Sequence, residues 1–79
     1  MAYSLQANIR NYIAKYFRKD SVSDIDRLRE DLFAHDVDLI ELSMHLEILY
    51  SVDNIEDKIV RAKTVGDIIQ IVMEKKNLI

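Results

Sequence analysis

The segment DLFAHDVDLIELSMHLE, residues 31–47, places ionisable side chains at helical spacing. Asp38, Glu41 and His45 recur at intervals of three and four residues, which puts them on one face of a helix. Carboxylates and imidazoles, with His35 nearby, are groups that a divalent cation accepts. The spacing matches no established ligand motif, so we expect no metal site. An acidic, solvated face with His45 paired to Glu41 is the simpler interpretation.

Other site chemistries find no support in the sequence. The chain has no cysteine, which excludes disulfides and thiolate metal sites. It also lacks a glycine-rich phosphate loop, an HExxH motif and a serine–histidine–aspartate arrangement, so we expect no enzyme activity. Residues 36–50 contain acids and no lysine or arginine, unlike the recognition helix of a DNA-binding protein.

The hydropathy pattern argues against a membrane protein. No apolar run approaches the ~20 residues of a transmembrane helix. The start, MAYSLQANIRNY, has polar and charged residues where a signal peptide needs an apolar stretch. We therefore expect a cytoplasmic protein with neither a membrane nor a nucleic acid as partner.

Charge is segregated along the chain. Residues 20–57 hold twelve Asp and Glu against two arginines, whereas residues 1–19 and 58–79 are net basic. Such an acidic middle attracts a basic protein partner and repels phosphates. A face that is simply solvated remains the alternative on charge alone.

Hydrophobic periodicity predicts the elements that position these residues. Helices are expected over about residues 4–18, 36–50 and 55–60, and from a cap at Thr64 to about Lys76. Ser4 is the expected cap of the first helix, and Thr64 with Asp67 forms an acidic variant of the capping box. The absence of proline and the single glycine favour long helices over a sheet with many turns. We predict one all-α domain over residues 1–79, a monomeric bundle of three longer helices and one short helix.

The connection over residues 19–35 lacks a sustained period, and a short helical turn near 26–29 is possible. A loop of this length inside a small domain is unusual and often functional. The apolar residues expected to pin it to the core are Val22, Ile25, Leu28 and Leu32.

Two apolar stripes run along the helix expected at residues 36–50. The first comprises Leu39, Leu42, Leu46, Leu49 and Tyr50 and is expected to face the core. The second comprises Val37, Ile40, Met44 and Ile48. The second stripe exceeds what one core contact needs, so it could cover a cavity or meet a partner. Deeper burial is the alternative for Val37 and Ile40.

Residues 31–42 resemble the attachment segment of acyl carrier proteins, which has the sequence Asp-Leu-Gly-Ala-Asp-Ser-Leu-Asp, then two residues and Glu-Leu. The matching residues are Asp31, Leu32, Ala34, Asp38, Glu41 and Leu42. KTVGDIIQIV is similar to the Thr-Thr-Val start of the family's last helix, so the resemblance covers essentially the whole chain. The departures are Asp36 at the serine, His35 at the preceding aspartate, Phe33 at the glycine and Ile48 at an acid.

The resemblance implies a four-helix bundle that carries acyl groups as thioesters on a 4'-phosphopantetheine arm, attached to the serine that begins the second helix. It also implies that this helix docks on basic surfaces of acyl-metabolism enzymes. Carried over to this chain, the charged contacts are Asp38, Glu41 and Glu47. The apolar contacts carried over are Val37, Ile40 and Met44.

Asp36 changes that chemistry. A carboxylate is a weak nucleophile, and its product with the β-phosphate of coenzyme A would be an acyl phosphate that hydrolyses. Ser43 and Ser51 lie away from the helix N-terminus that favours a phosphate. We therefore predict that no 4'-phosphopantetheine is attached, while Asp36 serves as the helix N-cap as well as serine would. The expected function is an acyl carrier protein or close relative in acyl metabolism, with a non-carrier interaction module as the alternative.

Overall fold

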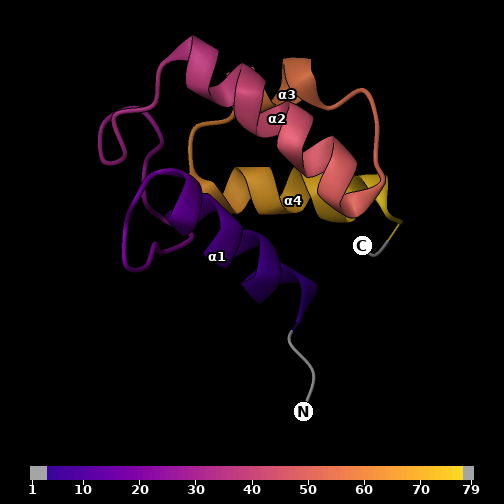
Figure 1. Ribbon diagram of the computed structural model, residues 1–79, viewed down its shortest axis with the longest axis horizontal. Helices are drawn as coiled ribbons and strands as arrows, with labels where there is room; N and C mark the ends of the chain where they lie inside the picture. The colour runs from indigo at the N-terminus through magenta and orange to yellow at the C-terminus, as the bar shows by residue number, and fades with distance from the viewer. Residues whose placement is uncertain (1–3, 78–79) are drawn as a thin grey trace.

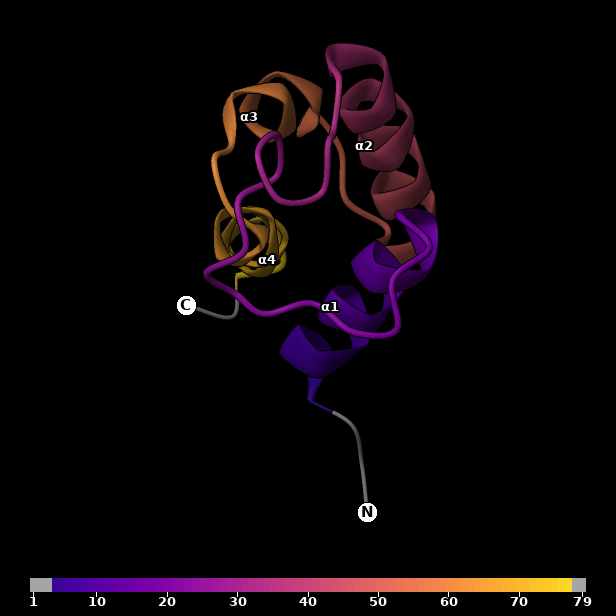
Figure 2. The same cartoon turned by 90° about the vertical axis from the view of Figure 1, so that its left-hand side faces the viewer.

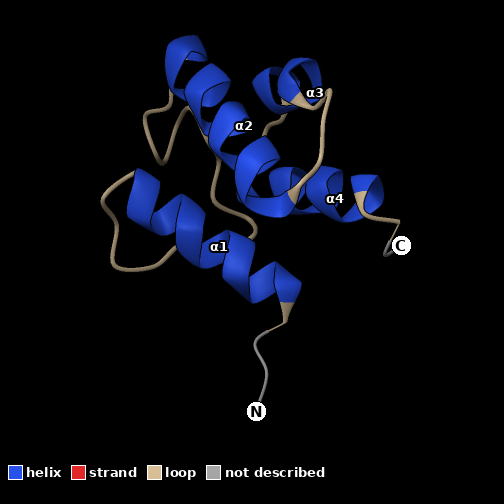
Figure 3. Cartoon of the chain, turned by 45° about the vertical axis from the view of Figure 1, so that its right-hand side comes forward, coloured by secondary structure: helices blue, strands red, loops and turns tan. Residues whose placement is uncertain are grey.

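The computed structural model of the chain describes residues 4–77. The elements are α1 (Leu5–Tyr16), α2 (Asp36–Tyr50), α3 (Glu56–Arg61) and α4 (Val65–Lys75). Every regular element among these residues is a helix, as Figure 3 shows. The predicted all-α bundle of three longer helices and one short helix is confirmed. The first three residues of the stretch tested for a signal peptide lie outside the described residues.

The helices are arranged around α4. Figure 1 shows α2 above α4 and α1 below it, with the long first loop at one end of the bundle. Figure 2 views α4 nearly along its axis, with α3 above it and α2 and α1 to its right. The most extensive contacts join α2 to α3 and α1 to α4. Between residues 4 and 77, every helix is too short or too polar to cross a bilayer.

Aliphatic side chains from all four helices and the loops form one core. Its largest fully buried apolar members are Ile9, Ile13, Leu28, Leu39, Leu42, Leu46, Ile55, Ile59, Val65, Ile68 and Val72. Burial of such side chains contributes about 1.5–3 kcal/mol each relative to exposure, which offsets the entropy cost of ordering so short a chain. Leu49 is exposed, so its expected place in the core is wrong.

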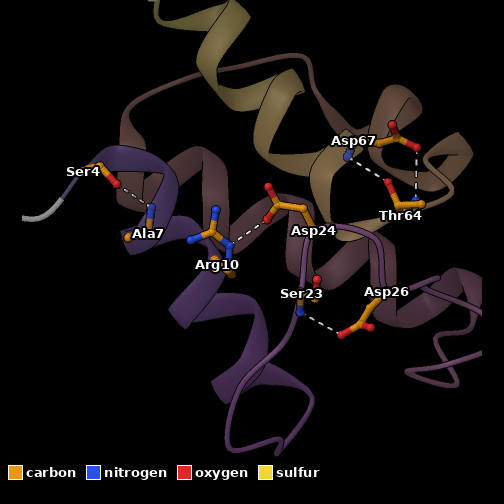
Figure 4. Close-up of polar contacts among 8 residues, drawn as sticks. All are labelled: Ser4, Ala7, Arg10, Ser23, Asp24, Asp26, Thr64 and Asp67. Carbon is orange, nitrogen blue, oxygen red and sulfur yellow. Dashed lines mark hydrogen bonds and ion pairs between the residues drawn. The ribbon is translucent and has the colours of Figure 1, made fainter.

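The N-caps of α1 and α4 are the predicted residues. The Ser4 side chain accepts a hydrogen bond from the Ala7 N–H at 3.0 Å, and the Thr64 hydroxyl accepts one from the Asp67 N–H at 3.2 Å (Figure 4). Asp67 in return accepts the Thr64 N–H at 3.1 Å, which completes the predicted capping box. α1 ends two residues earlier than expected because Arg18 takes a left-handed conformation with φ of 59°.

The first loop is tied to the α3–α4 connection by backbone hydrogen bonds. Leu28 N–H donates to the Lys63 carbonyl at 2.9 Å, and Gly66 N–H donates to the Asp24 carbonyl at 2.8 Å. A Cβ at position 66 would meet that carbonyl oxygen at 3.1 Å, so this close approach favours glycine. Arg10 of α1 pairs with Asp24 at 2.7 Å on the same loop (Figure 4). These contacts order a connection that has no helix of its own.

Burial in this loop agrees with the expectation at three of four positions. Val22, Leu28 and Leu32 are buried, whereas Ile25 is 82% exposed. Ile25 lies in the turn where the Asp26 N–H donates to the Ser23 carbonyl, and that turn directs its side chain outward. The region near 26–29 forms a hydrogen-bonded turn and not a helix.

Candidate functional site

Asp36 is the first residue of α2, and His35 occupies the N-cap position. The prediction that Asp36 is the N-cap is therefore wrong by one residue. His35 has extended backbone angles, and its N–H donates to Asp38 Oδ2 at 2.9 Å. This contact satisfies a backbone donor at the helix start, and it leaves the Asp36 side chain free to point elsewhere.

The Asp36 carboxylate is held by an arginine from the first loop. Arg29 Nη2 lies 2.7 Å from Asp36 Oδ1 and 3.0 Å from the Val60 carbonyl oxygen. One guanidinium thus joins the loop, the start of α2 and the end of α3. Both side chains remain largely exposed, so the pair is weak, of the order of 0–1 kcal/mol.

Phe33 precedes this site in a left-handed conformation with φ of 58°. That region suits glycine, since a Cβ there clashes with the backbone. The phenyl ring is exposed and has the Lys19 ammonium 6.0 Å from its centroid. The glycine that acyl carrier proteins have at the matching position is thus the residue that this backbone favours.

An apolar stripe on α2 faces solvent. Val37 is 69% exposed and Ile48 79% exposed, and Met44 is exposed between them. Ile40 is half-buried. Deeper burial of Val37 is therefore excluded, and the stripe is open to a partner.

The acidic residues expected to dock each have an internal contact. Asp38 accepts from the His35 backbone, and Glu41 accepts a hydrogen bond from Tyr16 Oη. Glu47 Oε2 accepts the Ile55 N–H at 3.2 Å, which fastens the loop between α2 and α3. Glu47 is half-buried, so Glu41 is the most accessible of the three carboxylates.

Polar side chains form the seam between α1 and α2, which comprises Asn8, Tyr12, Tyr16, Glu41, His45 and Tyr50. Tyr12 Oη lies 2.6 Å from His45 Nδ1, and Tyr50 Oη donates to Asn8 Oδ1. The expected pairing of His45 with Glu41 is wrong, because α1 supplies a tyrosine to each of them. Burial, and then the hydrogen bond to Glu41, raises the pKa of Tyr16 well above its ordinary value. Within residues 4–77 no three metal-binding side chains gather.

The two serines that follow Asp36, one within α2 and one at its C-terminal end, differ in how exposed their hydroxyls are. Ser43 is fully buried, and its Oγ donates to the Ile40 carbonyl at 2.6 Å. Ser51 is exposed at the C-terminal end of α2, in a left-handed conformation with φ of 55°. Neither hydroxyl lies at the helix start where Asp36 stands.

Sequence reasoning missed three residues at this site. Tyr12 and Tyr16 have the helical spacing of the apolar residues of the first helix, which indicates the core, yet their hydroxyls reach α2. Their spacing of four residues equals that of Glu41 and His45, and this match was a usable signal. Arg29 gave none, since it lies in a loop without periodicity.

Comparison with known proteins gives the same family as the attachment segment. The chain is 31% identical over 75 residues to the acyl carrier protein of Rickettsia canadensis (strain McKiel) and to that of Rickettsia rickettsii (strain Iowa), covering 92% of this chain and 87% of each relative. The acyl carrier protein of Rickettsia prowazekii (strain Madrid E) is 29% identical over the same coverage. The chain belongs to the acyl carrier protein family. No family model and no solved structure matches it.

Two features lie together on α2 of this family member. In this member the start of α2 presents a carboxylate paired to Arg29, and the neighbouring face of α2 presents exposed aliphatic side chains.

Proposed function

We propose that this acyl carrier protein family member docks on basic surfaces of acyl-metabolism enzymes through α2 and carries no 4'-phosphopantetheine at position 36. It acts as a protein partner and not as an enzyme. The observation that supports the proposal most is Asp36 itself, an exposed carboxylate on the first turn of α2 at 2.7 Å from Arg29.

The chemistry of attachment requires a hydroxyl. An alcohol oxygen that attacks the β-phosphate of coenzyme A gives a stable phosphodiester and releases the nucleotide half. A carboxylate oxygen would give a mixed anhydride, which water cleaves, and its negative charge opposes the approach of a pyrophosphate. The Ser43 hydroxyl is buried and bonded to a carbonyl, so it offers no substitute.

The docking face combines aliphatic and acidic groups. Val37, Ile40 and Met44 supply apolar contact, and the exposed Glu41 carboxylate supplies charge at the same helix. Charge of this kind speeds association with a basic surface, while the apolar anchors slow dissociation. Asp38 and Glu47 contribute charge nearby although their oxygens also serve internal hydrogen bonds.

Attachment is tested by incubating the chain with coenzyme A and a phosphopantetheinyl transferase of broad specificity, followed by intact-mass spectrometry. We expect no added mass on the chain and complete addition to the Asp36→Ser variant. Asp36→Asn is the matched control, because it removes the charge without supplying a hydroxyl and should stay unmodified. A stable phosphopantetheine adduct on the unaltered chain would refute the proposal.

Docking is tested by competition. The unaltered chain should inhibit loading of the Asp36→Ser variant by the same transferase, since it occupies the enzyme without being consumed. Val37→Ala and Met44→Ala in the competitor should weaken inhibition about fivefold or more. Glu56→Gln removes an exposed acid on α3 and should leave inhibition unchanged. Equal inhibition by all four competitors would exclude α2 as the docking surface.

The alternative of a non-carrier module that regulates or helps assemble an enzyme complex uses the same face. The exposed stripe on α2 supports it, because these side chains are open to a partner whether or not an arm is attached. Inhibition by an unmodified chain would support this role directly. If Asp36→Ser also refuses the arm, inhibition is measured on the loading of another acyl carrier protein that has the serine. Inhibition of that loading by the unaltered chain would then leave the interaction role without the carrier role.

A further inference from the structure

A pocket of about 500 Å³ lies between the first loop and the end of α3. It is lined by Arg27, Arg29, Val60, Arg61, Ala62 and Lys63, with Glu30 as its acidic member. Four of the chain's eleven lysines and arginines thus surround one hollow in a protein of net charge −3. The volume falls in the range of about 300–1,000 Å³ that is typical of small-molecule sites.

The two walls of this pocket are fixed to each other by the backbone. Arg27 forms an isolated antiparallel bridge with Thr64, and Leu28 N–H donates to the Lys63 carbonyl at 2.9 Å. Arg29 adds a contact to the Val60 carbonyl at 3.0 Å. The cationic side chains therefore start from positions that need little ordering when a ligand arrives.

Each arginine is held at the pocket by an exposed carboxylate. Arg29 pairs with Asp36 at 2.7 Å, Arg61 with Asp57 at 2.9 Å, and Arg27 with Asp31 at 3.4 Å. Exposed pairs of this kind are weak, so an anion of higher charge can take over the guanidinium N–H groups. The exposed Lys63 adds a further positive charge at the rim.

Ligand chemistry follows from these groups. Guanidinium forks match the geometry of phosphate oxygens, and their flat faces also stack on aromatic rings. Val60 and Ala62 provide a small apolar wall beside them. We propose that this pocket binds a small phosphorylated molecule of nucleotide size without a covalent bond, with Arg29 and Arg61 holding the phosphates. Binding turns Arg29 away from Asp36, so ligand and carboxylate compete for one guanidinium.

The test is titration of the isotope-labelled full chain with adenosine diphosphate at constant low ionic strength, followed by amide chemical shifts. We expect saturable shifts at residues 27–30 and 60–63 and at Asp36, which loses its arginine, and much weaker binding of adenosine and of inorganic phosphate. Arg61→Gln should weaken binding about tenfold, and Arg61→Lys, which keeps the charge but loses the fork, should fall between. Lys58→Gln removes the same charge from α3 outside the pocket lining and should change affinity less than about twofold.

Asp36→Asn should change the affinity for adenosine diphosphate in the opposite direction. Releasing Arg29 from its carboxylate should strengthen binding by about threefold or more. If Lys58→Gln weakens binding as much as Arg61→Gln does, the interaction is non-specific charge attraction and the proposed site is wrong. Shifts that spread over α1 without saturation would lead to the same conclusion. Unchanged affinity in Asp36→Asn would overturn the role of Arg29. No enzyme is present in this titration, so its failure is separate from failure of docking through α2.

Discussion

Phe33 has a backbone conformation that is unfavourable for a residue with a bulky side chain. With φ of 58° it lies in the left-handed region, which costs a residue with a Cβ about 1 kcal/mol or more. Phe33→Gly should therefore raise the free energy of unfolding by about 0.5–1 kcal/mol, because the exposed ring buries little. Urea denaturation measures the change. Phe33→Ala removes the ring but keeps the Cβ, so an equal gain in that variant would show that strain is not the cause.

Tyr16 makes stability sensitive to alkaline pH. Burial and the bond to Glu41 raise its pKa in the folded chain, so the folded protein keeps a proton that the unfolded chain loses above pH 10. Stability from this group is complete below that value and is lost as pH rises through the folded pKa. Urea midpoints measured from about pH 9 to about pH 11 should fall, and Tyr16→Phe should fall less steeply. Parallel curves for the two proteins would contradict this assignment.

For single residues, the sequence predicts the exposure of some side chains but not the partners of others. Exposure of Met44 and Ile48 followed from a second stripe that one core contact could not use. The partners of Asp36 and His45 did not follow, because Arg29 and Tyr12 come from segments whose approach depends on tertiary packing. Periodicity locates a side chain on its own helix but not the residue that meets it.

The cap of α4 shows how an element depends on one side chain. Thr64 accepts the Asp67 N–H and bridges to Arg27 of the first loop through its backbone. Thr64→Ala should lower the free energy of unfolding by about 1 kcal/mol, since it leaves a donor at the helix start without its partner. Thr64→Ser keeps the acceptor and serves as the control in thermal melts. A loss in the serine variant equal to that in alanine would assign the effect to packing of the methyl group.

The elements themselves were largely predictable, because each has a local signal. Apolar stripes gave α1, α2 and α4, and the caps Ser4 and Thr64 gave two of their starts. The predicted C-terminal ends of the helices were less accurate. α1 stops where Arg18 turns left-handed and Lys19 N–H reaches back to the Ala14 carbonyl at 2.8 Å, a choice made by the following loop.

For the whole molecule, stability rests on one small core. Leu46 is fully buried, and Leu46→Ala should cost about 2–5 kcal/mol out of a total of about 5–15 kcal/mol for a domain. Ile48, two residues later on α2, is 79% exposed, and Ile48→Ala should change stability by less than about 0.5 kcal/mol. Urea denaturation of both variants measures the contrast. Similar losses in the two would mean that the α2 stripe is covered by the protein itself.

The seam between α1 and α2 differs from the rest of the bundle because water can replace its contacts. Phenol, imidazole and carboxylate groups there bond to water almost as well as to each other, whereas the aliphatic contacts of α1 with α4 have no such substitute. The seam is therefore the place where two helices of the bundle, α1 and α2, separate most easily. Water can replace the hydrogen bonds of the seam while the aliphatic contacts between α1 and α4 stay intact. We therefore expect local opening between α1 and α2 without global unfolding.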